Sequence, residues 1–461
     1  MTSLPGFSTD IDERVLAVTR ENPEFPYNPD YNSGDPLGIS WMHSTVGGPL
    51  RSSSATAYLM PAVNSRSNID LLYNAQVTRL IQSGRAGSVP IFRGVEFARS
   101  SRSKRYTATA TKEVVLSAGA IGTPQILLLS GIGPKDELSQ LGIKTIVDSP
   151  QVGKNLVDHP ILPVQWTVNS NNTFDPILRG GIALDDALKD YHTTGQGRLA
   201  ANGVSNHMAF FRLPDDSSLL AAGDPSVGGT APHFELAIAV SDLSLLLPWT
   251  KLTFLPRTVS SLLLNRLLQL VLTFLSLTSL SPQPLVSIDM KVLKFVTDFE
   301  VSEGTLTLAS KDPFAHPIID PKLLDSEFDK QAMLYSLRAS QRFAASQAFS
   351  DYITGNFTSL VTDEEVFAYM AQQGTTIKHP FCTARMNQDP SQGVVDGKLL
   401  VHNVRGLRII DASIWVRGLL YQLTSHLTVL FLQPHIPAGH PQVPIYIIAE
   451  RAADVIKESW A

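Results

Sequence analysis

The 461-residue chain has little cysteine, no strong excess of charge and no uninterrupted apolar run of membrane-spanning length. Its one cysteine, Cys382, excludes an internal disulfide and any metal site built from several cysteines. The net charge of −5 gives no basic footprint for nucleic acid. The most apolar stretch, residues 259–280, is interrupted by Asn265, Arg266 and Gln269, which favours a buried or partner-facing helix over a membrane span. No basic segment followed by an apolar core opens the chain, so no signal peptide is expected.

Length and composition predict more than one domain, with sizeable hydrophobic cores. A chain of 461 residues favours two domains, and 43% of its residues are hydrophobic. Residues 1–37 are polar and rich in proline and asparagine, so we expect loop there. Strand-like alternation runs through residues 67–118, most clearly at Ile91–Phe97. Periodicity and end signals predict helices at 123–141, 325–345, 362–374 and 446–460, and a strand at 406–413.

One local pattern joins a strand to a helix through glycine. The apolar run Val114–Ala118 precedes a glycine-containing segment, 119–133. Thr123 is placed to cap a helix that begins at Pro124, and Ser130-Gly131 is placed to end it. Backbone N–H groups at such a joint can face a phosphate, although many ordinary strand–helix joints share the pattern.

The full string at 119–133 resembles the second signature of the glucose–methanol–choline (GMC) family of flavin oxidoreductases. Further segments resemble the same family in the right order, and the resemblance runs from about Gly38 to the end of the chain. These segments are Arg51–Leu59, Ala75–Leu80, Gly153–Pro160, His379–Met386, Leu407–Ser413 and Pro437–Gln442.

The resemblance implies an α/β fold, α+β overall, in which a Rossmann-like FAD-binding domain accompanies a substrate domain with an antiparallel sheet. The FAD-binding domain would be discontinuous, with a first part at residues 1–155 and a C-terminal part at 395–461. Residues 156–394 would form the substrate domain.

The resemblance also implies the chemistry. Oxidation of an alcohol needs a base for the hydroxyl proton and an acceptor for the hydride, and histidine suits the first task near neutral pH. His440 and His379 fall on the family's two active-site histidines, and which of them is the base stays open. By the same resemblance, FAD would be held by Val77, Asp411, Ala412, Pro441 and Gln442.

Three residues near these motifs are interpreted differently. Cys382 occupies a glycine position of the family motif H-P-x-G-T-A-x-M, so it would be strained if the backbone there has positive φ. An inert buried cysteine is favoured over a catalytic thiol. Asp158 and His159 are expected to be structural, although they lie in a family motif.

The chain departs from the family pattern in two ways. No G-x-G-x-x-G string follows a strand near its start, so the family comparison predicts an N-terminally truncated chain that lacks the first βαβ unit. A leucine-rich insertion of 18 residues, 416–433, separates the two C-terminal motifs. Its in-frame length suggests a translated intron, and residues 286–302 are a weaker second case.

The expected activity is FAD-dependent oxidation of a CH–OH group, in the manner of fungal aryl-alcohol oxidases and sugar dehydrogenases. Two alternatives stay open: a non-catalytic fragment without FAD, and an enzyme similar to flavin-dependent hydroxynitrile lyases. The expected partners are a small alcohol and an oxygen or quinone acceptor, with no nucleic acid, no membrane span and no metal. This branch of the family is often secreted, but localisation and oligomeric state are not predicted.

Overall fold

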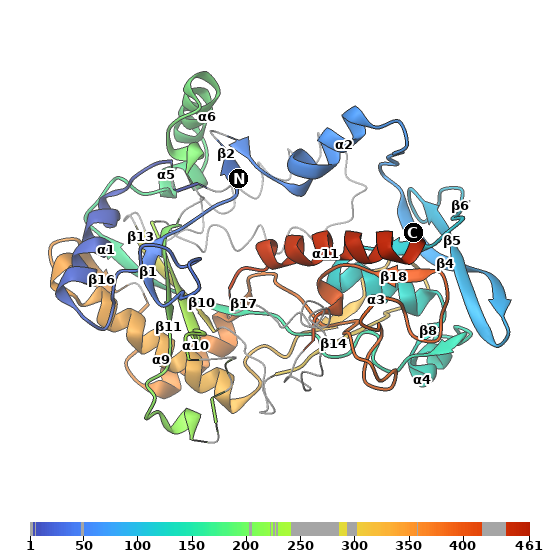
Figure 1. Cartoon of the computed structure of the whole chain (residues 1–461). Coiled ribbons are helices and arrows are strands. Elements are labelled where there is room, and N and C mark those ends of the chain that lie inside the picture. Colours follow the sequence, from blue (N-terminus) through green and yellow to red (C-terminus); the bar gives the residue numbers. More distant parts are fainter. Residues whose placement is uncertain are drawn as a thin grey trace.

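The computed structural model describes most of the chain as two packed groups of elements (Figure 1). The described residues are 3–4, 6–47, 50–201, 205–221, 223–224, 226, 229–240, 285–292, 302–356, 358–416 and 439–461. Antiparallel sheets, helices and two short parallel strand pairs confirm the predicted mixture of helix and sheet.

The first group is built on a seven-stranded antiparallel sheet. Its strand order is β1-β11-β12-β13-β10-β16, with β17 also paired to β10. Strands β10, β11 and β12 are buried on both faces along most of their length, and α9 packs against the sheet (Figure 1). The strands are β1 (Gly38–Trp41), β10 (Pro160–Val168), β11 (Ser205–Phe211), β12 (Phe234–Ala239), β13 (Leu285–Val292), β16 (Ile353–Asn356) and β17 (Thr375–Thr376).

The N-terminal segment belongs to this first group, and the expectation of loop over residues 1–37 is wrong. Helix α1 (Asp10–Glu21) forms there because Thr9 and Asp12 make a capping box. Ile11, Val15 and Val18 repeat at helical spacing and are buried in the core of the large sheet. The polar composition concealed this narrow apolar stripe.

The second group contains a three-stranded antiparallel sheet and a parallel pair of strands. β4 (Gln76–Ala86), β5 (Val89–Ala98) and β6 (Tyr106–Thr109) form the sheet. β7 (Val114–Leu116) pairs in parallel with β18 (Leu407–Ile409), which joins two segments almost 300 residues apart. Helix α11 (Gln442–Trp460) lies above α3 (Gly119–Leu129) in this group (Figure 1). A separate core of buried apolar residues unites them.

Helix α3 begins five residues before the expected start. Its N-cap is Ala118, so Pro124 lies inside the helix and Thr123 is not its cap. A proline inside a helix removes one backbone donor, here the one facing the carbonyl of Ala120. The hydroxyl of Thr383 donates to that carbonyl at 2.7 Å, which compensates for the missing bond. Ser130 ends the helix as predicted, followed by Gly131 with φ of 76°.

The other predicted helices are confirmed with small shifts at their ends. α9 spans Glu327–Ala344, and α10 spans Asp363–Gln373 with the expected Thr362 capping box and Gly374 end. The remaining helices are α2 (Met60–Ser65), α4 (Lys135–Gln140), α5 (Asp175–Leu178) and α6 (Ile182–Thr194), with single turns η1 (Ala55–Leu59), η2 (Arg198–Ala200), η3 (Ser218–Leu220), η5 (Gln347–Phe349) and η6 (Ala412–Ile414). The remaining strands are β2 (Val46–Gly47), β3 (Leu50–Arg51), β8 (Ile132–Gly133), β9 (Val147–Asp148), β14 (Thr305–Thr307) and β15 (Ile318–Asp320).

Several sequence predictions fall wholly or partly outside the described residues. The apolar stretch 259–280 lies outside them, as does the insertion 416–433 apart from Val416. Among described helices, none has the length and apolarity needed to cross a membrane. The proposed second intron, 286–302, overlaps β13, whose backbone pairs with β10 on one side and β12 on the other. Its excision would remove a central strand, which argues against that hypothesis.

Candidate active site

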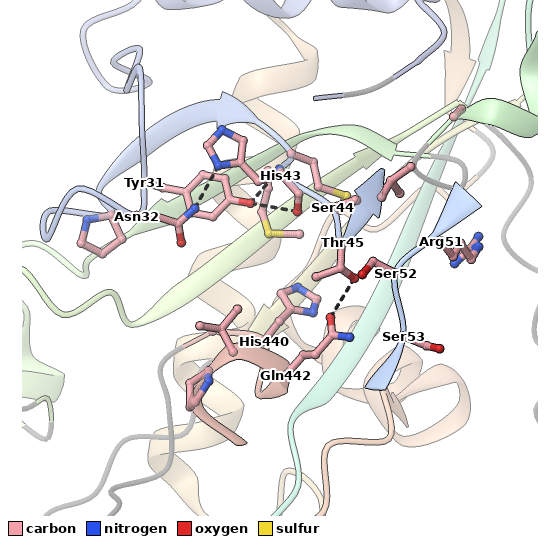
Figure 2. Close-up of a pocket in the computed structure, with 18 of the residues that line it drawn as sticks. Tyr31, Asn32, His43, Ser44, Thr45, Arg51, Ser52, Ser53, His440 and Gln442 are labelled. Atoms are coloured by element: carbon pink, nitrogen blue, oxygen red, sulfur yellow. Dashed lines mark hydrogen bonds between the residues drawn. The ribbon is translucent and has the colours of Figure 1, made fainter. Parts of the chain in front are cut away.

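A cavity of about 750 Å³ opens beside the large sheet (Figure 2). Its wall combines residues of segment 31–53, Tyr191 near the end of α6, residues 199–201 at η2, strand β11, and the start of α11 with the turn before it. Figure 2 shows His440 and Gln442 at one end, and Tyr31, Asn32 and His43 at the other. The cavity therefore has two polar ends joined by apolar side chains such as Met208 and Phe210.

His440 lies on the cavity wall, in the turn before α11, with its side chain 47% exposed. Its Nε2 is 3.3 Å from Oε1 of Glu235, a residue of β12 whose side chain is only 3% exposed. A buried carboxylate requires a partner, and an ionised one accepts hydrogen bonds only. An ionised Glu235 would hold a proton on His440 Nε2.

His379 packs against His440, a lining residue, but does not itself line the cavity. The two imidazole rings meet edge to face, with centroids 5.1 Å apart. The sequence separates them by 60 residues, and the fold brings them together as the family motifs predicted. On its other side, His379 Nδ1 lies 3.2 Å from Nδ1 of His159, which is fully buried.

The turn that carries His379 is held by neighbouring backbone and side-chain bonds. The N–H of His379 donates to Oδ1 of Asp158 at 2.8 Å, and Thr376 donates its hydroxyl to Oδ2 of the same carboxylate. Lys378 has φ of 65° in this turn. A strained, well-bonded turn of this kind fixes the position of the following imidazole.

Cys382 adopts the left-handed backbone conformation that its glycine position suggested. Its φ is 69° and its side chain is fully buried. The neighbouring Phe381 stacks on Trp415 with centroids 4.6 Å apart. Cys382 is thus a packed, strained residue in the described structure, in line with the inert interpretation.

Asp411 binds the joint between β7 and α3. Its Oδ2 accepts from the N–H of Gly119 at 3.0 Å and from the hydroxyl of Thr123 at 2.6 Å, and its Oδ1 accepts from the N–H of Ser413. An anionic residue close to a phosphate needs hydrogen-bond donors for its own charge, and the Asp411 carboxylate has them. It also occupies the first free N–H of α3, so that helix end does not fit a pyrophosphate.

The remaining predicted cofactor residues lie on three different elements. Val77 is in β4. Among the described strands β4 pairs only with β5, so the other edge of β4 has backbone groups that are not paired to a strand. The carbonyl of Ala412 accepts from the N–H of Cys382 at 3.2 Å. Pro441 caps α11, and the side chain of Gln442, its first residue, accepts from the hydroxyl of Thr45 at 3.2 Å.

The far end of the cavity is polar, and sequence reasoning missed it. Asn32 Nδ2 donates to Nδ1 of His43 at 3.0 Å, which leaves the proton of a neutral His43 on Nε2. The Tyr31 hydroxyl accepts from the N–H of His43 at 2.8 Å, and burial raises the pKa of Tyr31. Tyr31 and Asn32 come from residues 1–37, which were expected to be loop, and His43 follows that segment; no motif drew attention to any of the three.

Glu235 was also missed, although its sequence context held a signal. It is the one charged residue in the apolar strand β12, and a charge inside a buried strand needs a specific partner. No cluster of three or more histidine, cysteine, aspartate or glutamate residues suited to a metal occurs in the described part of the chain.

Comparison with family models identifies the class of protein. Two models, both described as GMC oxidoreductase, match residues 16–161 and 300–429. The chain belongs to the GMC oxidoreductase family.

Two relatives from fungi cover nearly the whole chain. Pyranose dehydrogenase 3 of Leucoagaricus meleagris is 32% identical over 98% of this chain and 67% of its own length. Dehydrogenase eriK of Hericium erinaceus is 33% identical over 99% of this chain and 69% of its own length.

Solved structures share the fold. Formate oxidase of Aspergillus oryzae matches with a TM-score of 0.79 and 25% identity over 99% of this chain and 72% of that one. A fungal aryl-alcohol oxidase matches with a TM-score of 0.70 and 24% identity over 100% and 72% of the two chains.

FAD is the cofactor of this family, and part of the described surface fits it. The open edge of β4 and the N-terminal end of α11 offer backbone groups, and the bonded Asp411 tolerates a nearby anion. The end of α3 does not fit the pyrophosphate, as its first N–H is taken by Asp411. The residues therefore fit the two ends of the cofactor better than its phosphates.

Proposed function

We propose that this protein oxidises a CH–OH group with FAD, and that His379 and His440 handle the hydroxyl proton. The observation that supports this most is the edge-to-face contact of His379 with His440, the one of the two that lines the cavity. When bound, FAD accepts the hydride. The chain's own residues position the hydroxyl and move its proton.

We assign the base to His379 and the steadying hydrogen bond to His440. Nε2 of His440 is already engaged by the buried carboxylate of Glu235 at 3.3 Å, which leaves His379 as the imidazole proposed to accept the substrate proton. Contacts at a catalytic base commonly tighten when substrate binds.

The proposed cofactor contacts follow the sequence prediction. Val77 would hold the adenine end through its backbone, and Asp411 and Ala412 would lie near the pyrophosphate and the flavin ring. Pro441 and Gln442 would place the first turn of α11 against that ring. In domain terms, we propose a flavin domain near 1–155 and 395–461 and a substrate domain near 156–394. The core contacts of α1 favour moving residues 10–39 to the substrate domain.

The polar far end of the cavity favours a substrate with several hydroxyl groups over a simple aryl alcohol. His43 and Asn32 offer hydrogen-bond donors at a distance from the histidine pair, as a sugar ring would use (Figure 2). The Leucoagaricus meleagris relative is named pyranose dehydrogenase 3, which agrees with this choice. Oxygen or a quinone would then reoxidise the flavin.

The assignment is tested by rapid-mixing measurement of flavin reduction by an aldopyranose under anaerobic conditions. His379→Ala and His440→Ala should each slow reduction by about 10²- to 10⁴-fold, the usual contribution of acid–base groups. His402→Gln is the matched control, because the His402 ring bonds the Asn387 carbonyl away from the proposed histidine pair, and it should reduce its flavin at the parent rate. Full activity in either alanine variant would contradict the assignment. Cyanohydrin cleavage without flavin reduction would favour the lyase alternative.

A further inference from the structure

His159 is a fully buried histidine directly behind the proposed base. It lies just before β10, and its ring meets the ring of His379 edge to face at 5.4 Å. The Nδ1 atoms of the two rings are 3.2 Å apart. Phe381 packs against His159, with ring centroids 5.7 Å apart. Neither His159 nor His379 lines the cavity: His159 contacts His379, which in turn contacts the lining residue His440.

A hydrogen bond between two Nδ1 atoms needs a proton on one of them and a lone pair on the other. In a neutral imidazole, a proton on one nitrogen leaves a lone pair on the other nitrogen. The direction of this one bond therefore sets the state of His379 Nε2. A base requires the lone pair at Nε2, and so requires the proton at Nδ1, donated to His159.

The backbone around both rings keeps this geometry fixed. Oδ1 of Asp158 accepts from the N–H of His159 and from the N–H of His379, both at 2.8 Å. The hydroxyl of Thr376 donates to Oδ2 of Asp158 and accepts from the N–H of Lys378. One carboxylate thus joins the two segments that carry the rings.

We propose that His159 is a positioning residue for His379, which holds the Nδ1–H tautomer by accepting that proton at its own Nδ1. The bond also supports the imidazolium that forms when His379 takes the substrate proton. The arrangement parallels the carboxylate behind the histidine of hydrolase triads, with a neutral acceptor in place of the charged one. This inference rests on the proposed role of His379 as base.

The groups that face His379 set the expected pH behaviour. They are His159 behind it, His440 beside it with Glu235 as its partner, and the Asp158 carboxylate at its backbone. Loss of the His159 acceptor lets the neutral ring of His379 exchange between tautomers. Only the fraction of His379 with the proton on Nδ1 then has a lone pair at Nε2, so flavin reduction slows at every pH.

The test is ¹⁵N–¹H long-range correlation NMR on the full chain labelled at histidine, with His379→Asn used to assign the His379 signals. We expect wild-type His379 to show the Nδ1–H tautomer. His159→Phe, which keeps the ring shape without an acceptor, should show averaged tautomers. His159→Asn, which can place Oδ1 near the lost Nδ1, should restore the Nδ1–H form and serves as the second variant if the phenylalanine variant does not fold.

Kinetics give an independent readout on the holoenzyme. His159→Phe should lower kcat about 10- to 100-fold, as outer partners of functional histidines do, with little change in KM. His159→Asn should recover most of the rate. An Nε2–H tautomer in wild-type His379, or unchanged His379 signals in His159→Phe, overturns the inference. Full activity in His379→Ala would instead overturn the proposed base and leave the NMR result standing.

Discussion

Replacing Cys382 by glycine and by alanine should reverse the usual order of stability. Glycine is ordinarily less stable than alanine by roughly 0.5–1 kcal/mol, because it gains more freedom in the unfolded chain. Cys382 has φ of 69°, where a side chain costs about 1–2 kcal/mol. Both variants lose the buried sulfur, so that loss cancels between them. Cys382→Gly should therefore be more stable than Cys382→Ala by roughly 0.5–1 kcal/mol.

The assay is urea unfolding of the full chain followed by tryptophan fluorescence. Trp415, stacked on Phe381 beside Cys382, reports on this core. Ala384→Gly is the matched control: Ala384 is fully buried nearby and is absent from the described residues with positive φ. The control should lose about 1 kcal/mol or more relative to the parent. A Cys382→Ala variant as stable as Cys382→Gly, or more so, would refute the strain argument.

Three further predictions follow from individual contacts. Glu235→Gln should slow flavin reduction about 100-fold in rapid-mixing kinetics, because His440 loses its charged partner, and a parent-like rate would contradict that pairing. Thr383→Val should lower the free energy of unfolding by about 1–3 kcal/mol in urea, because the Ala120 carbonyl loses its hydrogen-bond donor. Thr383→Ser keeps the hydroxyl and should not lower it. Burial lowers the pKa of His233 in the folded chain, so as pH falls the unfolded chain binds this proton at a higher pH than the folded chain does. The free energy of unfolding should therefore fall as pH drops below about 6.5. Thermal melts of His233→Gln should show a smaller fall.

The sequence predicted correctly those helix ends that are determined by residues within a few positions of them. The capping box at Thr362 and the glycine at 374 gave α10 both ends correctly. The start of α3 was wrong because the bond that makes Pro124 tolerable inside the helix comes from Thr383, some 260 residues away. No local rule contains that partner.

In the candidate site, too, some residues could be predicted from local motifs and others could not. His379 and His440 were predicted because each sits in its own motif, and the structure brings their rings together. Glu235 and His159 became visible as their partners only through contacts made by the folded chain. Cys382 lies between these cases, since a motif position suggested its positive φ before the structure showed it.

The central claim is that this chain binds FAD and uses His379 and His440 to oxidise an alcohol. The most direct measurement is anaerobic titration of the FAD-reconstituted chain with an aldopyranose, following flavin absorbance and the carbonyl product. The account predicts a yellow protein whose flavin is bleached as one equivalent of carbonyl product forms. A colourless protein that ignores added FAD, or a bound flavin that no alcohol reduces, would contradict it.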